Sequence, residues 1–279
     1  MTCAKSLSAV AVMLIVISAM GSAARAEVYV GQGGAAETPL DQVDHGGWDT
    51  LLKKHVDDDG YVNYTALHRS SKDRQALTAY LNKLSKANPS LKSSNDGKLA
   101  FWINAYNALT VHGILREYPT SSIRNHTARF FGYNIWKDLY LNVAGRAYSL
   151  DHIEHQLLRK MDEPRIHFAI VCASIGCPRL LNRAYTADKV DTQLETNAKD
   201  FFRRRQNFQH SGNRFYLSSI LDWFGEDFGS SQAAQLRRIS KWLPEASQSA
   251  ASRGSVSVSF MDYNWNLNDQ KSRPATARR

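Results

Sequence analysis

One apolar segment near the middle of the chain constrains the fold more than any other. Residues 101–111 read FWINAYNALTV, and the pattern predicts a helix over Lys98–Arg116 that begins near Asp96 and ends before Pro119. A helix that is apolar on nearly all sides must be buried. We therefore expect a core helix here, in a chain of 279 residues that is long enough to build a substantial core.

Two asparagines interrupt this apolar helix. Asn104 and Asn107 are three residues apart, so they share one face of the helix. A buried amide is costly unless its donors and acceptor have partners. Either the two amides fasten neighbouring loops by binding backbone, or they line a site as a pair of donors.

The rest of the chain mixes helical and strand patterns without strict alternation. Helices are predicted over 43–56, 73–87, 151–160, 186–205 and, in one or two pieces, 221–243. Hairpins are predicted over 139–150 and 207–217, and strands over 165–172 and 255–260. We expect one helix-rich α+β domain over residues 43–269, with a small mixed or antiparallel sheet.

The N-terminus has the pattern of a cleavable secretory signal peptide. Lys5 precedes the charge-free apolar stretch Ala9–Met20, and small residues Ala24 and Ala26 precede a cleavage point before Glu27. The stretch is shorter than the roughly 20 residues that a membrane span needs. We expect a periplasmic or secreted protein with residues 1–26 removed, a flexible leader over 27–42, and a disordered basic tail over 270–279.

Charge and cysteine content limit the partners and the stabilising bonds. Loss of Lys5 and Arg25 with the signal peptide lowers the formal net charge from +9 to +7. A basic surface outside the cytoplasm suits an anionic envelope polymer or lipid headgroups, besides a small molecule or peptide. Because the protein is expected to be exported, we expect no nucleic-acid partner. We expect no membrane span after cleavage and no cofactor. Only Cys172 and Cys177 remain after cleavage, so the core must hold the fold.

The segment RIHFAIVCASIGCP, Arg165–Pro178, is the main candidate for chemistry. Its apolar first half predicts a buried strand, followed by a loop of small residues. If a short helix begins at Pro178, Cys177 lies at its N-cap, where the helix dipole would lower the thiol pKa. Cys172 is the competing nucleophile, and His167 or His155 could serve as its base. A Cys172–Cys177 disulfide and two plain buried thiols remain open alternatives.

A second polar group lies at the start of the helix predicted from Asp151. Asp151 and Glu154 have the spacing of a capping box. His152, Glu154 and His155 resemble metal ligands by residue type, but their order is not that of a zinc protease motif. We therefore expect capping, or a role for Glu154 or His155 in orienting a catalytic group, and no metal.

Several motifs together resemble the bacterial and plant family catalogued as domain of unknown function 547. They are FWINAYNAL (101–109), SIR (122–124), SLDHIEH (149–155), RIHFAIVCASIGCP (165–178), AYT (184–186), LSSI (217–220) and DYNWNLN (262–268). The resemblance covers about residues 51–268 and identifies the chain as an exported bacterial member. It implies no defined activity, but its motifs point to these site residues: Asn104, Asn107, Glu154, His155, His167, Cys172 and Cys177.

These residues support two hypotheses of different classes. In the first, the protein is a thiol-dependent hydrolase or acyl transferase in which Cys177 or Cys172 attacks an amide or ester. His167 or His155 would be the base, and Asn104 or Asn107 would orient it or hold the oxyanion. A papain- or transglutaminase-like fold would suit this chemistry, although the apolar helix carries Asn104 where those enzymes place their cysteine. In the second, a non-enzymatic envelope-binding protein uses the same polar residues as core fasteners.

Overall fold

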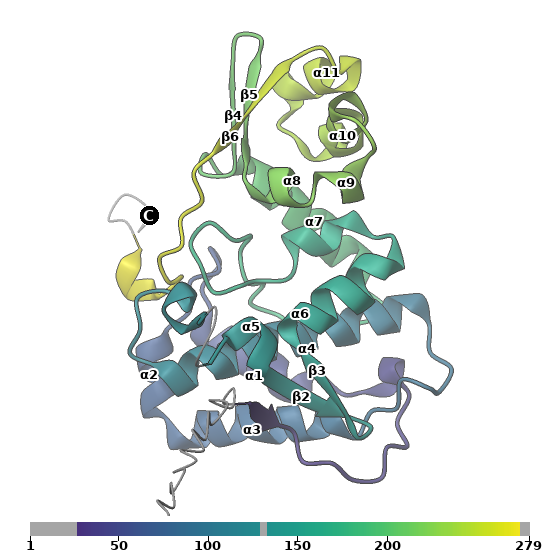
Figure 1. Cartoon of the computed structure of the whole chain (residues 1–279), viewed down its shortest axis with the longest axis vertical. Coiled ribbons are helices and arrows are strands. Elements are labelled where there is room, and N and C mark those ends of the chain that lie inside the picture. The colour runs from purple at the N-terminus through teal and green to yellow at the C-terminus, as the bar shows by residue number, and fades with distance from the viewer. Residues whose placement is uncertain (1–26, 129–132, 274–279) are drawn as a thin grey trace, which may run out of the picture.

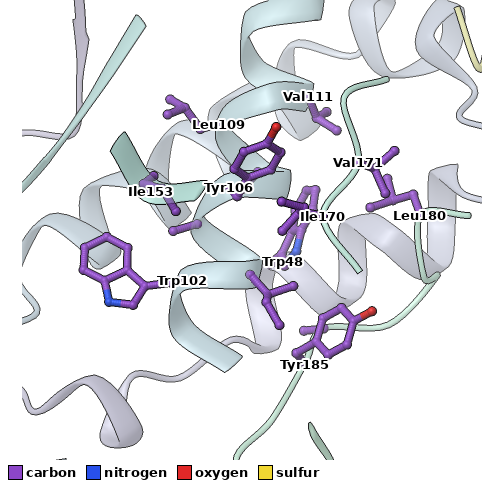
Figure 2. Close-up of a cluster of buried hydrophobic side chains, with 14 of the residues drawn as sticks. Trp48, Trp102, Tyr106, Leu109, Val111, Ile153, Ile170, Val171, Leu180 and Tyr185 are labelled. Atoms are coloured by element: carbon purple, nitrogen blue, oxygen red, sulfur yellow. The ribbon is translucent and has the colours of Figure 1, made fainter. Parts of the chain in front are cut away.

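Helix α4, Asn95–Glu117, runs through the larger of two hydrophobic cores, as its apolar sequence predicts. Ser94 begins the helix by accepting a hydrogen bond from the Gly97 amide. The structure is a computed structural model that describes residues 27–128 and 133–273 (Figure 1). The predicted signal peptide, residues 1–26, lies outside the described residues. Figure 2 shows α4 side chains Trp102 and Tyr106 among other buried residues of this larger core.

Three further helices complete the N-terminal part of the larger core. They are α1 (Gly46–His55), α2 (Tyr64–Arg69) and α3 (Ser71–Ser85). Helix α3 packs against both α1 and α4, with Leu77, Leu81 and Leu84 on its buried face. The helix predicted over residues 73–87 is therefore confirmed. It begins two residues earlier than predicted, at Ser71, because Ser70 caps it.

A small mixed sheet lies beside these helices. The predicted hairpin is present as β2 (Leu139–Val143) and β3 (Arg146–Ser149), antiparallel with Tyr140 opposite Ser149. β1 (Val28–Val30) adds to β2 in parallel, with Val28 beside Leu139. The expected leader, residues 27–42, therefore contributes a strand to the fold. It also carries the turn Leu40–Gln42, whose Leu40 is buried in the larger core.

The chain after β3 forms a helical segment of unusual winding. α5 (Ile135–Asp138) precedes the hairpin, and α6 (Leu150–His152) follows it and continues as a π-helical turn, Ile153–Leu157. The hydroxyl of Ser149, not Asp151 as predicted, caps this helix by accepting from the His152 amide at 3.1 Å. The helix starts one residue earlier than expected because Leu150 is already helical and fully buried.

The strand predicted over Arg165–Cys172 is wrong. Pro164–Phe168 is a 3-10 helix, with the fixed backbone of Pro164 at its first turn, and irregular buried chain follows it. Side-chain amides take the place of a neighbouring strand. Asn107 binds the Ala169 carbonyl and the Val171 amide, and Asn197 binds the Phe168 carbonyl. An apolar run whose backbone is satisfied in this way cannot be distinguished from a strand by pattern alone.

Helix α7, Val190–Arg203, connects the two cores. Its first half packs Val190 and Leu194 into the larger core, and its second half packs Phe201 and Phe202 into the smaller one. The helix begins four residues later than predicted, because residues Thr186–Lys189 form a tight turn in which the Lys189 amide donates to the Thr186 carbonyl.

The smaller core is built by the C-terminal third of the chain. Its helices are α8 (Ile220–Trp223), α9 (Gly225–Phe228), α10 (Gln232–Ile239) and α11 (Glu245–Arg253). Its sheet contains β4 (Phe208–Ser211), β5 (Arg214–Ser218) and β6 (Ser257–Met261), with β4 antiparallel and β6 parallel to β5. The region predicted as one or two helices is therefore broken into more pieces. The whole is an α+β fold with small mixed sheets, as predicted.

After β6 the chain returns to the larger core, as Figure 1 shows in yellow. Leu267 is buried there, and the Asn268 amide donates to the Ala173 carbonyl. In the tail predicted from Gln270, Gln270–Ser272 is a 3-10 helix and Arg273 pairs with Asp57, whereas residues 274–279 lie outside the described residues. Within the described residues, no helix combines the length and apolarity needed to cross a membrane.

Candidate functional site

A cleft of about 280 Å³ opens where the two cores meet. Its walls are formed by residues of α4, α5, the π-helical turn, the segment after Pro164, α8 and the chain after β6, residues 262–268, which we call the C-terminal segment. The predicted residues that line it are Glu154, His155, His167, Cys172 and Cys177. Residues that sequence reasoning did not assign to the site complete the wall: Tyr106, Asn134, Trp136, Lys137, Asp151, Ile170, Pro178, Ile220, Trp223, Phe224, Tyr263 and Trp265.

The two cysteines that line this cleft are in direct contact. Both are free thiols, and their Sγ atoms lie 2.7 Å apart. Cys177 is buried, whereas Cys172 is partly exposed. The helix predicted to begin at Pro178 is absent, because residues 178–185 are irregular chain, so no helix dipole acts on Cys177.

Hydrogen bonds, rather than a helix dipole, favour a thiolate at Cys177. Its sulfur accepts from the Cys172 amide at 3.1 Å and from the Tyr263 hydroxyl at 3.0 Å, and the Ser174 hydroxyl lies 3.4 Å away. Burial raises the pKa of Cys177, but the bonds from Cys172, Ser174 and Tyr263 outweigh burial and hold this pKa below its usual value. The bond to Cys177, together with burial, raises the pKa of Cys172 well above its usual value.

The loop that carries the sulfurs is held by the C-terminal segment. Ser174 pairs with Leu267 in an isolated bridge, and the Gly176 amide donates to the Asn264 carbonyl at 2.8 Å. Ala173, between Cys172 and Ser174, has a φ of 58°, a conformation that a non-glycine residue adopts only when its surroundings enforce it. The backbone of the thiol loop is therefore fixed from both sides.

His167 lines the same cleft and is oriented by a carboxylate. Its Nε2 lies 2.7 Å from Asp227 Oδ2, and its ring stacks on Phe224 at 4.3 Å between centroids. Arg159 binds both oxygens of Asp227 at 2.7 Å. Burial lowers the pKa of His167 to about 4, so the imidazole is neutral at pH 7. Since an ionised carboxylate only accepts, Nε2 carries the proton and Nδ1 is the acceptor nitrogen of the ring.

Glu154 supplies an acid to the cleft from the π-helical turn. Its Oε2 accepts from the Tyr106 hydroxyl at 3.1 Å, and burial raises its pKa to about 7. π-helical turns are often found at functional sites. His155, the next residue, places Nδ1 3.3 Å from Arg159 Nη1, so it contacts the group that holds Asp227.

The structure does not bring the two asparagines into the cleft. Asn104 binds the amide and the carbonyl of Tyr185 at 3.0 and 2.8 Å. Asn107 binds Val171 and Ala169 at 2.9 and 3.0 Å. Both side chains are buried with these backbone partners, so they position neighbouring segments.

The polar contacts of this region differ from those that the sequence predicts. Among the described residues, no imidazole nitrogen makes a hydrogen bond to a sulfur, and no three His, Cys, Asp or Glu side chains converge as metal ligands. Tyr263 and Asp227 were missed as site residues. Tyr263 lies in the closing DYNWNLN motif, which was a usable signal, whereas no pattern marked Asp227.

Fold and site define the class as an α+β domain with paired thiols in a cleft between two cores. Residues 90–202 match the model of the family described as "Protein of unknown function, DUF547", the family that the motifs predicted. The matched range contains Glu154, His167 and both cysteines but ends before Tyr263, which contacts the two sulfurs. No curated protein and no solved structure matches the chain.

Proposed function

We propose that the protein is a thiol-dependent hydrolase or acyl transferase that acts on an amide or ester through Cys177. The observation that carries this proposal is the set of hydrogen bonds on the Cys177 sulfur inside a cleft that also contains a carboxylate-oriented histidine. A thiolate is the nucleophilic form of cysteine. The donors around Cys177 favour that form without a base in contact with the sulfur.

The first half of the reaction acylates the sulfur. The Cys177 thiolate attacks the substrate carbonyl, and the carbon–oxygen or carbon–nitrogen bond breaks as a thioester forms. The leaving alkoxide or amine takes a proton from the carboxylic acid of Glu154. Because burial holds the pKa of Glu154 at about 7, this acid is protonated below neutral pH.

The second half releases the acyl group. His167 Nδ1 accepts a proton from water, or from an acceptor hydroxyl or amine, which attacks the thioester and frees the Cys177 thiolate. Asp227 stabilises the imidazolium that forms, Arg159 holds Asp227 in place, and His155 contacts Arg159. In this scheme Asn104 and Asn107 are positioning residues.

Aromatic side chains at the cleft suit a substrate with a flat or apolar group. Trp223 is 46% exposed and stacks on Trp265 with 5.7 Å between ring centroids. Trp136 meets Trp265 edge-on at 6.2 Å. Such rings bind apolar or flat groups by stacking beyond simple area burial, so we assign them to substrate binding.

The test is a search for an acylated sulfur. The full chain with Cys3→Ser, which leaves only the two cleft thiols, is reduced and mixed with p-nitrophenyl butyrate. We expect p-nitrophenol release and a butyryl adduct that peptide mass spectrometry places on Cys177. Cys177→Ser should abolish both signals. The control is His152→Gln, a histidine beside the site that does not line the cleft, and it should retain both. Turnover that persists in Cys177→Ser would overturn the proposal.

We also propose that the chain is exported to the periplasm or beyond, on the strength of the Lys5, Ala9–Met20 and Ala24–Ala26 pattern. After expression in a bacterium with two membranes, N-terminal sequencing of the periplasmic fraction should begin at Glu27. Ala26→Asp should block cleavage and leave a longer chain. Recovery of the full-length wild-type chain in the cytoplasm would contradict export.

A further inference from the structure

The two thiols of the cleft are arranged for more than nucleophilic attack. A nucleophile needs one sulfur, but here a second one lies 2.7 Å away on the same loop, five residues apart in sequence. The loop is fixed by the left-handed Ala173 and by backbone hydrogen bonds to residues 264–268. The fold thus holds the two sulfurs in contact, and a disulfide can form only between sulfurs brought together in this way.

We propose that Cys172 and Cys177 form a reversible disulfide, and that the oxidant is a low-molecular-weight dialkyl disulfide that enters the cleft. Both sulfurs line the cleft, so a small disulfide can reach them from solvent. The inference does not depend on acyl transfer, because it uses only the contact between the sulfurs and their access to the cleft.

The reaction proceeds by two exchanges. The Cys177 thiolate attacks one sulfur of RSSR, forming a Cys177–S–S–R mixed disulfide and releasing RS⁻. The Cys172 thiol gives its proton to that RS⁻, which leaves as RSH. The Cys172 sulfur then attacks Cys177 Sγ, expelling the second RS⁻, which takes a proton from water. In sum, the dithiol and RSSR give the protein disulfide and two RSH, and excess thiol reverses the reaction.

The two cysteines differ in their hydrogen bonds, and this difference indicates which of them reacts first. Cys177 receives the Tyr263 and Cys172 donors, so it holds the negative charge and attacks first. Cys172, hydrogen-bonded to Cys177, stays protonated until the mixed disulfide removes that negative charge. It is then released to act as the resolving thiol. The disulfide removes the nucleophile, so it would also switch off thiol chemistry in the cleft.

The experiment uses the full chain with Cys3→Ser and bis(2-hydroxyethyl) disulfide as the oxidant. After exposure, free thiols are alkylated and the protein is digested with trypsin. Arg165 and Arg179 bracket a peptide, residues 166–179, that contains both cysteines and no other trypsin site. We expect this peptide unalkylated and lighter by two hydrogen atoms than its reduced form. Excess thiol should restore two alkylation sites.

Two variants test the order of events. Cys172→Ser keeps a hydroxyl beside Cys177 and should stop at a stable mixed disulfide on Cys177. Cys177→Ser should react far more slowly, because the remaining thiol is protonated. The inference is overturned if the wild-type peptide keeps both thiols, or if it ends with two separate adducts. Disulfide formation without ester hydrolysis would refute only the proposed function, and hydrolysis without disulfide formation would refute only this inference.

Discussion

At the scale of single residues, the Tyr263 hydroxyl has an unusual position. It donates to Cys177 Sγ at 3.0 Å, and it also lies 2.9 Å from Ser174 Oγ and 3.3 Å from Cys172 Sγ. Burial raises the pKa of Tyr263 well above its usual value, so the phenol keeps its proton and remains a donor. The ionisation of Cys177 therefore depends on this hydroxyl.

Tyr263→Phe is expected to raise the pKa of Cys177 by about one unit, since one hydrogen bond to a charged group contributes about 1.5 kcal/mol or more. The measurement is the rate of iodoacetamide alkylation of Cys177 as a function of pH in the Cys3→Ser background. Ser174→Ala should give a smaller rise, because its hydroxyl lies farther from the sulfur, at 3.4 Å. An unchanged midpoint in Tyr263→Phe would exclude the phenol as a donor to the thiolate.

Asp227 makes a separate contribution, through His167. In Asp227→Asn, an NH2 group replaces one of the two oxygens that accept from Arg159. We expect it to replace Oδ2, which His167 Nε2 also contacts, so that His167 takes the other tautomer and its Nδ1 gains a proton. Ester hydrolysis should fall roughly 10²- to 10⁴-fold, whereas the alkylation rate of Cys177 should stay the same.

The matched control for this variant is Glu226→Gln. Glu226 also pairs with Arg159, at 2.5 Å, but its side chain is 77% exposed and does not line the cleft. An exposed ion pair contributes little, so Glu226→Gln should hydrolyse esters at nearly the wild-type rate. If the rate of ester hydrolysis falls equally in both variants, the fall is caused by the loss of an Arg159 partner and not by a change in the tautomer of His167.

At the scale of elements, α4 ties two irregular segments to the larger core with its two asparagines. Asn107→Ala leaves the Ala169 carbonyl and the Val171 amide without partners, which should cost about 2–4 kcal/mol of unfolding free energy. Since Val171 precedes Cys172, the variant should also change the pH profile of thiol alkylation. Urea denaturation and alkylation measure the two effects.

Asn104→Ala is the matched control, because it removes the same pair of backbone bonds from the same helix. Its partner is Tyr185, which does not line the cleft. We expect a similar loss of stability with an unchanged alkylation profile. If both asparagine variants alter the thiol equally, the effect of Asn107 on the cysteine loop is not local.

The same elements explain how far sequence reasoning reached. α3, α4 and both hairpins were predicted because their spacing of apolar residues or their turn residues are local signals. The segment 165–172 was misread because its backbone partners, Asn107 and Asn197, lie about 30 to 60 residues away in sequence. Tyr263 and Asp227 escaped assignment for the same reason, since only tertiary contacts bring them to the sulfurs and to His167.

At the scale of the whole molecule, burial fixes the protonation of several groups. Burial lowers the pKa values of His45, His112 and His167 to about 4 and raises that of Glu154 to about 7. Between pH 4 and 6.5 the unfolded chain binds protons at these histidines that the folded chain does not, so stability falls as pH falls. Glu154 acts in the opposite sense between pH 4.5 and 7, because there its proton is bound only in the folded state.

On unfolding near pH 5.5, the three histidines each take up about one proton and Glu154 releases about one, which gives a net uptake of roughly two protons. The unfolding free energy should therefore fall by about 2–3 kcal/mol from pH 6 to pH 5. Glu154→Gln removes the opposing proton, so its stability should fall more steeply, by about 1.4 kcal/mol more over the same pH unit. Urea titrations of both proteins at pH 5 and 6, followed by tryptophan fluorescence, measure the difference. If the unfolding free energies of the two proteins change equally with pH, Glu154 is already ionised in the folded cleft and cannot serve as its acid.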